Sequence, residues 1–334
     1  MIITKTPFRM SFFGGGTDME EYFRENGGAV LSTTFDKYCY VNVRHLPRFF
    51  DYSTELSYSK TERVTSVDEI QHPAIRNAMK MLDMHEIRLT YEADLPARSG
   101  LGTSSSFAVG MLNAFYALEG KYADKKKLAD EAIYLERELC QEAGGWQDQI
   151  AAAYGGFNRI NFGPNGYEVL PVVISPERKK RLNDNIMMFF TGFTRFSSEV
   201  QKANNVSGTE DKRAKLKKMY ELVDEAESVL TDKERDLDDF GRLLDTTWRL
   251  KKSTGGVIST NSIDGLYEKG IAAGALGGKL LGAGGGGFLV FYVQPEKQAT
   301  VMEAMKDLMY IPFKFEDGGT RVIHYSPEIY EPLQ

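Results

Sequence analysis

Glycine and hydroxyl residues crowd the stretch RSGLGTSSS at 98–106, which leads directly into an apolar run. A glycine loop before a helix lets backbone N–H groups converge on phosphate oxygens, and the helix N-terminus adds partial positive charge. The stretch lacks the lysine of a G-x-x-x-x-G-K-[ST] loop and does not fit G-x-G-x-x-G. A plain helix cap would need one hydroxyl rather than four. The sequence therefore predicts a phosphate site in which hydroxyls from Thr103 to Ser106 cap the helix or bind Mg²⁺.

Two carboxylates, Glu136 and Asp148, flank the glycine pair Gly144–Gly145. A helix break at that pair can bring both acids to one site. Phosphoryl transfer uses one carboxylate to hold Mg²⁺ and another to accept or orient the proton of the attacking hydroxyl. The alternative for each acid alone is a solvated surface group.

The segment TPFRMSFFGGGTD at 6–18 carries a third set of polar side chains. Arg9 alternates with apolar residues on an expected strand, and Asp18 follows a glycine loop with room for a ligand. Arginine offers paired donors for phosphate, and aspartate accepts hydrogen bonds from sugar hydroxyls. A simple ion pair between Arg9 and Asp18 is the alternative.

A third glycine cluster, LGAGGGG, lies at 281–287. Three such clusters in one chain are more than tight turns alone would explain.

A mixture of strands and helices must position these motifs. Residue patterns predict strands at 1–13, 28–35 and 37–46 and several more along the chain. Helices are expected at about 104–118, from Asp124 to Gly144, at 147–154, as three long helices across 197–253, at 262–274 and at 295–309. The two kinds of element do not alternate strictly, which predicts an α+β fold rather than a doubly wound sheet.

Length and composition predict a two-lobed protein that acts on a small molecule. With 334 residues the chain is long enough for two lobes, expected at 1–170 and 171–334. The net charge of −6 and the alternation of basic runs with acids argue against nucleic acid binding. No apolar stretch is long enough to cross a membrane, and the N-terminus reads as a strand. The two cysteines suit a reduced cytoplasm, and the protein is expected to be a monomer or homodimer.

Taken in order, three segments resemble the signature motifs of the GHMP kinases, the superfamily of galactokinase, homoserine kinase, mevalonate kinase and phosphomevalonate kinase. PFRMSFFGGGTD is similar to P-G-R-x-N-x-I-G-E-H-x-D, LPARSGLGTSSS to P-x-x-x-G-L-G-S-S-x, and KLLGAGGGGFLVFY to K-x-T-G-A-G-G-G-G. The motifs keep the family's order over nearly the full chain. The resemblance implies two α+β lobes with ATP in the cleft between them.

The resemblance also implies roles for individual residues. The ATP phosphates would contact Ser99, Gly100, Leu101, Gly102, Thr103, Ser104, Ser105, Gly284 and Gly285. Ser104 and Glu136 would bind Mg²⁺, Asp148 would be the catalytic carboxylate, and Arg9 would act beside the acceptor hydroxyl. The acceptor sugar would contact Gly15, Gly16, Thr17 and Asp18.

Departures from the family pattern narrow the acceptor. Galactokinases have Glu-His where this chain has Gly15–Gly16, which argues against galactose. GGGTD, GGWQDQ and TGFTRFSSE look most like the heptose 7-phosphate kinase branch, whose members phosphorylate the C1 hydroxyl of D-glycero-D-manno-heptose 7-phosphate to the 1,7-bisphosphate in nucleotide-activated heptose biosynthesis. Lys5, Arg98 and Arg195 are candidate cations for the distal phosphate, with a salt bridge as the alternative for Arg195.

Two other functions stay open on the sequence. One is a fucokinase- or galactokinase-like enzyme that phosphorylates a sugar without a phosphate of its own. The other is a nucleotide-binding regulator that has lost catalysis.

Overall fold

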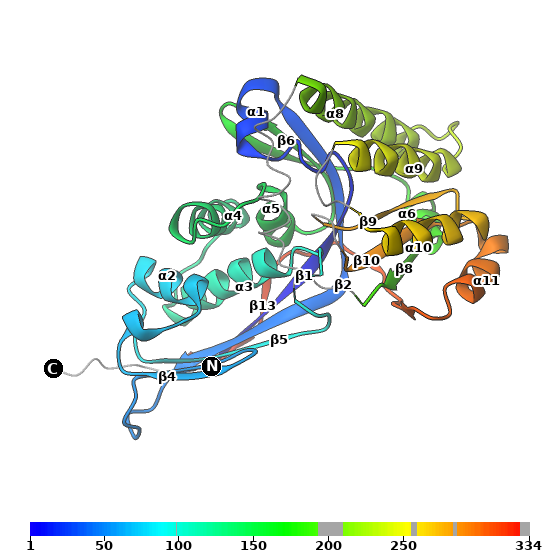
Figure 1. Ribbon diagram of the computed structural model, residues 1–334. Coiled ribbons are helices and arrows are strands. Elements are labelled where there is room, and N and C mark those ends of the chain that lie inside the picture. Colours follow the sequence, from blue (N-terminus) through cyan, green and yellow to red (C-terminus); the bar gives the residue numbers. More distant parts are fainter. Residues whose placement is uncertain (98, 193–209, 255–258, 283–285, 328–334) are drawn as a thin grey trace.

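The computed structural model describes residues 1–97, 99–192, 210–254, 259–282 and 286–327 (Figure 1). A nine-stranded sheet forms its centre. The strands of this sheet are β1 (Ile2–Phe13), β2 (Gly28–His45), β3 (Thr54–Ser57), β4 (Thr61–Val64), β5 (Ile87–Ala93), β6 (Phe157–Gly163), β7 (Gly166–Pro171), β12 (Phe315–Glu316) and β13 (Arg321–Tyr325). The order β13-β1-β2-β5-β3-β4 forms its main path, and β6 and β12 also pair with β2.

Strand β2 holds the large sheet together. Its 18 residues pair antiparallel with β1 along most of their length, with β6 over the first part and with β5 over the last. The eight residues from Gly28 to Phe35 are all buried, which is typical of a strand covered on both faces. The sequence predicted two strands here, at 28–35 and 37–46 with a break at Asp36, but β2 continues through that residue.

Helices cover both faces of this sheet (Figure 1). One core joins the sheet to α2 (Pro73–Met81), α3 (Thr103–Leu118), α4 (Lys125–Tyr134) and α5 (Gln147–Tyr154). A second core packs Phe8, Met10 and Phe12 of β1 against α8 (Glu210–Thr231) and α9 (Asp238–Ser253). The short helix α1 (Glu20–Asn26) follows β1, and the 3₁₀ turn η1 (Val67–Glu69) lies between β4 and α2 in the chain.

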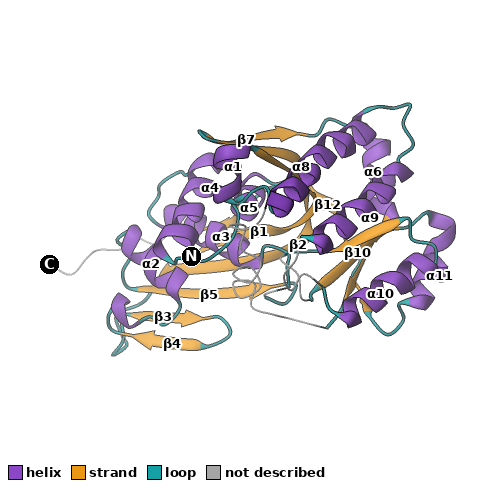
Figure 2. Cartoon of the chain, turned by 45° about the horizontal axis from the view of Figure 1, so that its top comes forward, coloured by secondary structure: helices purple, strands orange, loops and turns teal. Residues whose placement is uncertain are grey.

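A second sheet forms the rest of the C-terminal lobe. Its strand order is β11 (Met309–Tyr310), β8 (Ile186–Phe190), β10 (Phe288–Tyr292) and β9 (Gly277–Leu280). It packs with α9, α10 (Asn261–Ala272) and α11 (Pro295–Ala304), and α6 (Pro176–Asn185) leads into β8. Figure 2 shows this lobe beside the long strands of the first sheet.

Several expected elements differ in extent. Asp124 caps α4 as predicted, because its carboxylate accepts from the backbone N–H of Lys127 at 2.7 Å. The helix does not run to Gly144 as predicted: it becomes a π-helical turn, η2 (Leu135–Leu139), and ends there. The described residues of 197–253 hold two helices, α8 and α9, and residues 193–209 lie outside the described part.

Most residues of each lobe lie on their own side of the predicted boundary near residue 170. Strands β12 and β13, however, return from the C-terminal end to pair with β2 and β1 of the first sheet. The second core likewise contains β1 residues. The division into 1–170 and 171–334 therefore stays a prediction. Among the described residues, no helix has the length and apolar character needed to span a bilayer.

Candidate active site

The glycine loop before α3 makes its closest contacts through backbone atoms. Gly100 has φ +85°, and a Cβ on it would lie 2.3 Å from the carbonyl oxygen of Leu281. A Cβ on Gly282 would lie 2.4 Å from Cα of Gly100. Helix α3 then begins after Gly102, which has φ +71°. Two glycine clusters that are far apart in sequence are therefore in backbone contact at the N-terminus of a buried helix, where the partial positive charge favours anions.

One hydroxyl of this loop donates a hydrogen bond within the loop, and two others donate to the acid Glu136. The Ser99 hydroxyl donates to the carbonyl of Pro96 at 2.7 Å. The hydroxyls of Ser104 and Ser105 donate to the two carboxylate oxygens of Glu136 at 2.9 and 2.6 Å. Ser104 is exposed, whereas Thr103 is buried.

Glu136 is placed by the π-helical turn η2, an irregularity that is frequent at functional sites. Its carboxylate is 2% exposed, accepts from the side chain of Gln149, and lies beside exposed Ser104. The side-chain carbonyl of Gln149 is buried without a partner among the described residues. In that part of the chain no cluster of His, Cys, Asp or Glu could hold a metal by itself. One carboxylate and one hydroxyl suit Mg²⁺, which takes few protein oxygens and fills its shell with water and phosphate.

Arg9 and Asp148 form a two-point ion pair. Nε and Nη2 of Arg9 donate to the two oxygens of Asp148 at 2.7 and 2.8 Å. Nη1 of Arg9 donates to the carbonyl of Gly100 at 2.7 Å, so the same guanidinium contacts the glycine loop before α3. The pair replaces the suggested alternative of an Arg9–Asp18 ion pair. Asp148 lies at the start of α5 with its side chain a quarter exposed.

Asp18 lies buried beside this pair. It accepts from the backbone N–H of Gly16 at 2.9 Å, and a Cβ on Gly145 would lie 1.9 Å from its carboxylate. Burial raises the pKa of Asp18 above its ordinary value; the N–H of Gly16 opposes the shift and the charge of Asp148 adds to it. A carboxylate held in this way is a strong acceptor for a ligand hydroxyl.

A cavity opens in front of these groups, between the N-terminal loops on one side and α8 and α9 on the other. Its lining residues are Arg9, Ser11, Gly15, Gly16, Asp18, Met19, Arg137, Gly145, Gln147, Asp148, Lys212, Leu216, Met219, Lys251, Thr254, Lys279 and Gly282. Ser11 Oγ, Gln147 Oε1 and Arg137 Nε are buried without a hydrogen-bond partner among the described residues. Unpaired polar atoms in a cavity wall indicate a polar ligand.

Two lysines of the cavity were not expected from the sequence. Nζ of Lys251 donates to the carbonyl of Gly282 at 2.6 Å, and Nζ of Lys279 donates to the carbonyl of Phe12 at 2.8 Å. Burial and the charge of Arg9 lower the pKa of Lys251 to about 8, while Asp18 and Asp148 oppose this shift. Burial lowers the pKa of Lys279 well below its ordinary value.

The structure separates two predicted acceptor-binding residues from the cavity. The ammonium of Lys5 lies 3.7 Å over the ring of Tyr38, away from the lining residues. Thr17 is fully buried, and its hydroxyl bonds the backbone of Gly14 and Ala29. Both placements argue against contact with an acceptor. The predicted residues Arg98, Arg195, Gly284 and Gly285 lie outside the described residues.

Sequence reasoning did not single out Ser11, Arg137, Gln147, Lys212, Lys251 or Lys279. Lys279 carried a signal, because it opens the third glycine motif. Lys251 and Lys252 end α9, where paired lysines also suit the helix dipole. Nothing local distinguishes Lys251, which reaches the cavity, from Lys252, which pairs with Asp264.

Comparisons with known proteins agree with this geometry. The family models for the GHMP kinases N terminal domain and the GHMP kinases C terminal match residues 70–156 and 220–311. D-glycero-alpha-D-manno-heptose 7-phosphate kinase of Campylobacter jejuni is 29% identical over 96% of this chain and 98% of its own. Mevalonate kinase of Thermococcus sibiricus is 30% identical over 80% of this chain and 78% of its own. The crystal structure of a D-glycero-D-manno-heptose 1-phosphate kinase from Bacteroides thetaiotaomicron has a TM-score of 0.78 at 24% identity, and the match covers 99% of this chain and 100% of that chain.

The chain belongs to the GHMP kinases. It is a phosphotransferase with the two-lobed α+β fold of that family. The predictions of family, fold class and enzyme class are confirmed.

Proposed function

We propose that this kinase transfers the terminal phosphoryl group of ATP to the C1 hydroxyl of D-glycero-D-manno-heptose 7-phosphate and produces the 1,7-bisphosphate. The observation that carries the proposal is the Arg9–Asp148 pair. It lines a polar cavity and at the same time contacts the carbonyl of Gly100 in the phosphate loop. The name of the Campylobacter jejuni relative supports the acceptor.

Asp148 accepts the proton of the attacking hydroxyl as the new O–P bond forms and the bond to the leaving ADP breaks. Arg9 holds both carboxylate oxygens, which fixes the direction in which Asp148 faces the hydroxyl. Loop amides from Ser99 to Ser105 would bind the phosphates of ATP, with Gly284 and Gly285 closing the site. Asp18, with Gly15 and Gly16 leaving space, would accept hydrogen bonds from the sugar.

Ser104 and Glu136 would hold Mg²⁺, which supplies positive charge to the phosphate oxygens when bound. Their carboxylate and hydroxyl oxygens lie 2.9 Å apart at the start of α3. Ser105 and Gln149 hold the other oxygen of Glu136, so the carboxylate keeps one orientation.

The purified chain should be tested with ATP and four acceptors: heptose 7-phosphate, free heptose, fucose and galactose. We expect kcat/KM for heptose 7-phosphate to exceed the others by about 100-fold, because the phosphate adds charge-assisted bonds in a cation-rich cavity. ³¹P NMR of the product should show a phosphate on C1 and another on C7. EDTA should abolish turnover, and Mg²⁺ should restore it.

Equal or faster turnover of a free sugar would instead assign the enzyme to an unphosphorylated acceptor. ATP binding without turnover of any acceptor would favour a non-catalytic regulator. A product whose second phosphate is not on C1 would refute the assigned position.

A further inference from the structure

Two lysines of the cavity lack a carboxylate partner. Among the described residues neither Lys251 nor Lys279 forms an ion pair, and each ammonium bonds a backbone carbonyl. A desolvated ammonium without a counter-charge is costly in free energy. An anionic ligand in the cavity would supply that charge.

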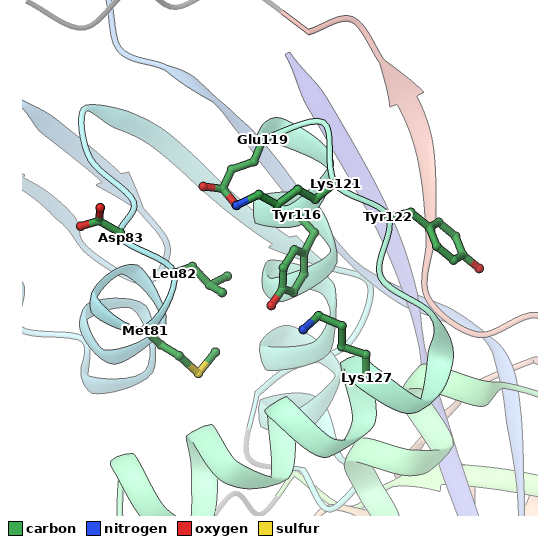
Figure 3. Close-up of a pocket in the computed structure, with 8 residues that line it drawn as sticks. All are labelled: Met81, Leu82, Asp83, Tyr116, Glu119, Lys121, Tyr122 and Lys127. Atoms are coloured by element: carbon green, nitrogen blue, oxygen red, sulfur yellow. The ribbon is translucent and has the colours of Figure 1, made fainter.

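Lysines in a second pocket behave differently. This pocket lies at the end of α3, where Lys121 and Lys127 contribute to its wall (Figure 3). Lys121 pairs with Glu119 at 3.1 Å, and Lys127 pairs with Glu131 at 2.6 Å. These surface charges are already balanced, so they indicate no ligand.

Lys251 stands where the phosphate loop meets the catalytic pair. Its ammonium bonds the carbonyl of Gly282, and Gly282 packs directly on Gly100. Arg9 in turn bonds the carbonyl of Gly100 and both oxygens of Asp148. A continuous chain of contacts therefore joins Lys251 to the carboxylate that faces the acceptor.

Within the described part of the chain, Lys251 also has N–H donors without an acceptor. An ammonium carries three N–H donors, and the structure assigns one of them to Gly282. Arg9 is committed to Asp148 and Gly100. Lys279 is 3% exposed and ties β9 to Phe12 of β1. Lys251, which is partly exposed in the cavity wall, is therefore placed to contact a group in transfer.

We propose that Lys251 is a catalytic residue whose protonated ammonium donates hydrogen bonds to the terminal phosphoryl group while that group passes from ATP to the acceptor hydroxyl. The P–O bond to ADP breaks, the bond to the acceptor oxygen forms, the hydroxyl proton goes to Asp148, and Lys251 keeps its own proton. The inference rests on the proposed kinase reaction at this site, whichever acceptor the enzyme uses.

The matched test compares Lys251→Met with Lys252→Met. Lys252 is next in sequence, but its ammonium pairs with Asp264 at 2.8 Å outside the cavity. We expect kcat to fall about 100-fold in K251M, with KM for the acceptor changed less than about threefold, because the ammonium contacts the phosphoryl group in transfer and not the acceptor. K252M should keep near wild-type kcat, and K251R should recover part of the rate.

A raised acceptor KM at unchanged kcat in K251M would place Lys251 on the acceptor's own phosphate and overturn the proposal. Equal losses of kcat in K251M and K252M would also overturn the proposal, because they would indicate a structural effect on α9.

The pH profile gives a second readout. The charged groups around Lys251 in this cavity are Arg9, Asp18, Arg137, Asp148, Lys212 and Lys279. With the pKa of Lys251 at about 8 in the free enzyme, kcat/KM of the wild type should fall as pH rises through 8, because kcat/KM reports the ionisation of free-enzyme groups. K251R should lack this fall, because a guanidinium stays protonated. The same alkaline limb in K251R would count against the proposal.

Nucleotide binding separates this inference from the choice of acceptor. The wild type and K252M should bind a non-hydrolysable ATP analogue more tightly than ADP. In K251M the ratio of these two affinities should be about tenfold smaller. If heptose 7-phosphate is not turned over but the preference is lost in K251M, the proposed acceptor fails and Lys251 keeps its role. An intact preference in K251M would refute the role directly.

Discussion

The glycine loop that we propose binds phosphate and the cavity that we propose binds the acceptor meet at Arg9, yet they are built by opposite means. The loop depends on missing side chains: Gly100 and Gly282 approach so closely that a Cβ on either would overlap backbone atoms. The cavity depends on side chains that arrive from separate elements, among them Asp148 from α5 and Lys251 from α9. Added volume should therefore break the loop, whereas lost charge or lost hydrogen bonds should break the cavity.

Removal of the Asp148 charge should have the largest effect. We expect Asp148→Asn to lower kcat about 1,000-fold, because the amide cannot accept the hydroxyl proton. Affinity for an ATP analogue, measured by calorimetry, should change less than about threefold, because the loop amides are untouched. Asp83→Asn, at a side chain 97% exposed, is the control. A kcat of D148N near that of D83N would remove Asp148 from catalysis.

A Cβ in the loop should have the next largest effect. Gly100 and Gly120 both have positive φ, +85° and +68°, but nothing lies within 4 Å of a Cβ on Gly120. Gly120→Ala should cost about 1 kcal/mol of unfolding free energy from strain alone. Gly100→Ala should cost at least about 2 kcal/mol and weaken ATP-analogue binding at least tenfold, because its Cβ meets Leu281. Denaturant titration and calorimetry measure both. Similar effects of the two variants would show that the close approach is unimportant.

The smallest effect concerns stability at Asp18. Because burial raises its pKa, Asp18 favours the folded state below its unfolded pKa, and this contribution is lost as pH rises through the folded pKa. The Tm of Asp18→Asn relative to that of the wild type should therefore be about 2 °C higher at pH 7 than at pH 4. The same variant should raise acceptor KM about tenfold. A Tm difference that is independent of pH would mean that burial does not destabilise the charged form of Asp18.

Local patterns predicted most elements of the fold. Asp124 begins α4 because a cap needs only its own backbone neighbours, and α3 begins at Thr103, one residue before the expected start. The end of α4 was predicted wrongly at Gly144, since the π-helical turn that carries Glu136 follows no local rule. The sequence did not predict β2 as one strand of 18 residues, because Asp36 indicates a break that tertiary pairing overrides.

The cations of the site were the weakest part of the prediction. Lys5 was predicted as a candidate cation near the cleft, but its ammonium lies over the ring of Tyr38. Lys251 and Lys252 look alike in sequence, and only the position of α9 against the third glycine cluster brings Lys251 to Gly282.

The sequence alone identified the family through its three glycine-rich motifs and proposed Asp18, Glu136 and Asp148 for the site, because residue types and motif spacing can be read directly from the chain. The tertiary structure decided that Arg9 pairs with Asp148, that Thr17 supports the backbone, and that two lysines line the cavity with no carboxylate partner among the residues it describes. Those facts depend on where separate elements meet, and side-chain charge is balanced only after they have packed together.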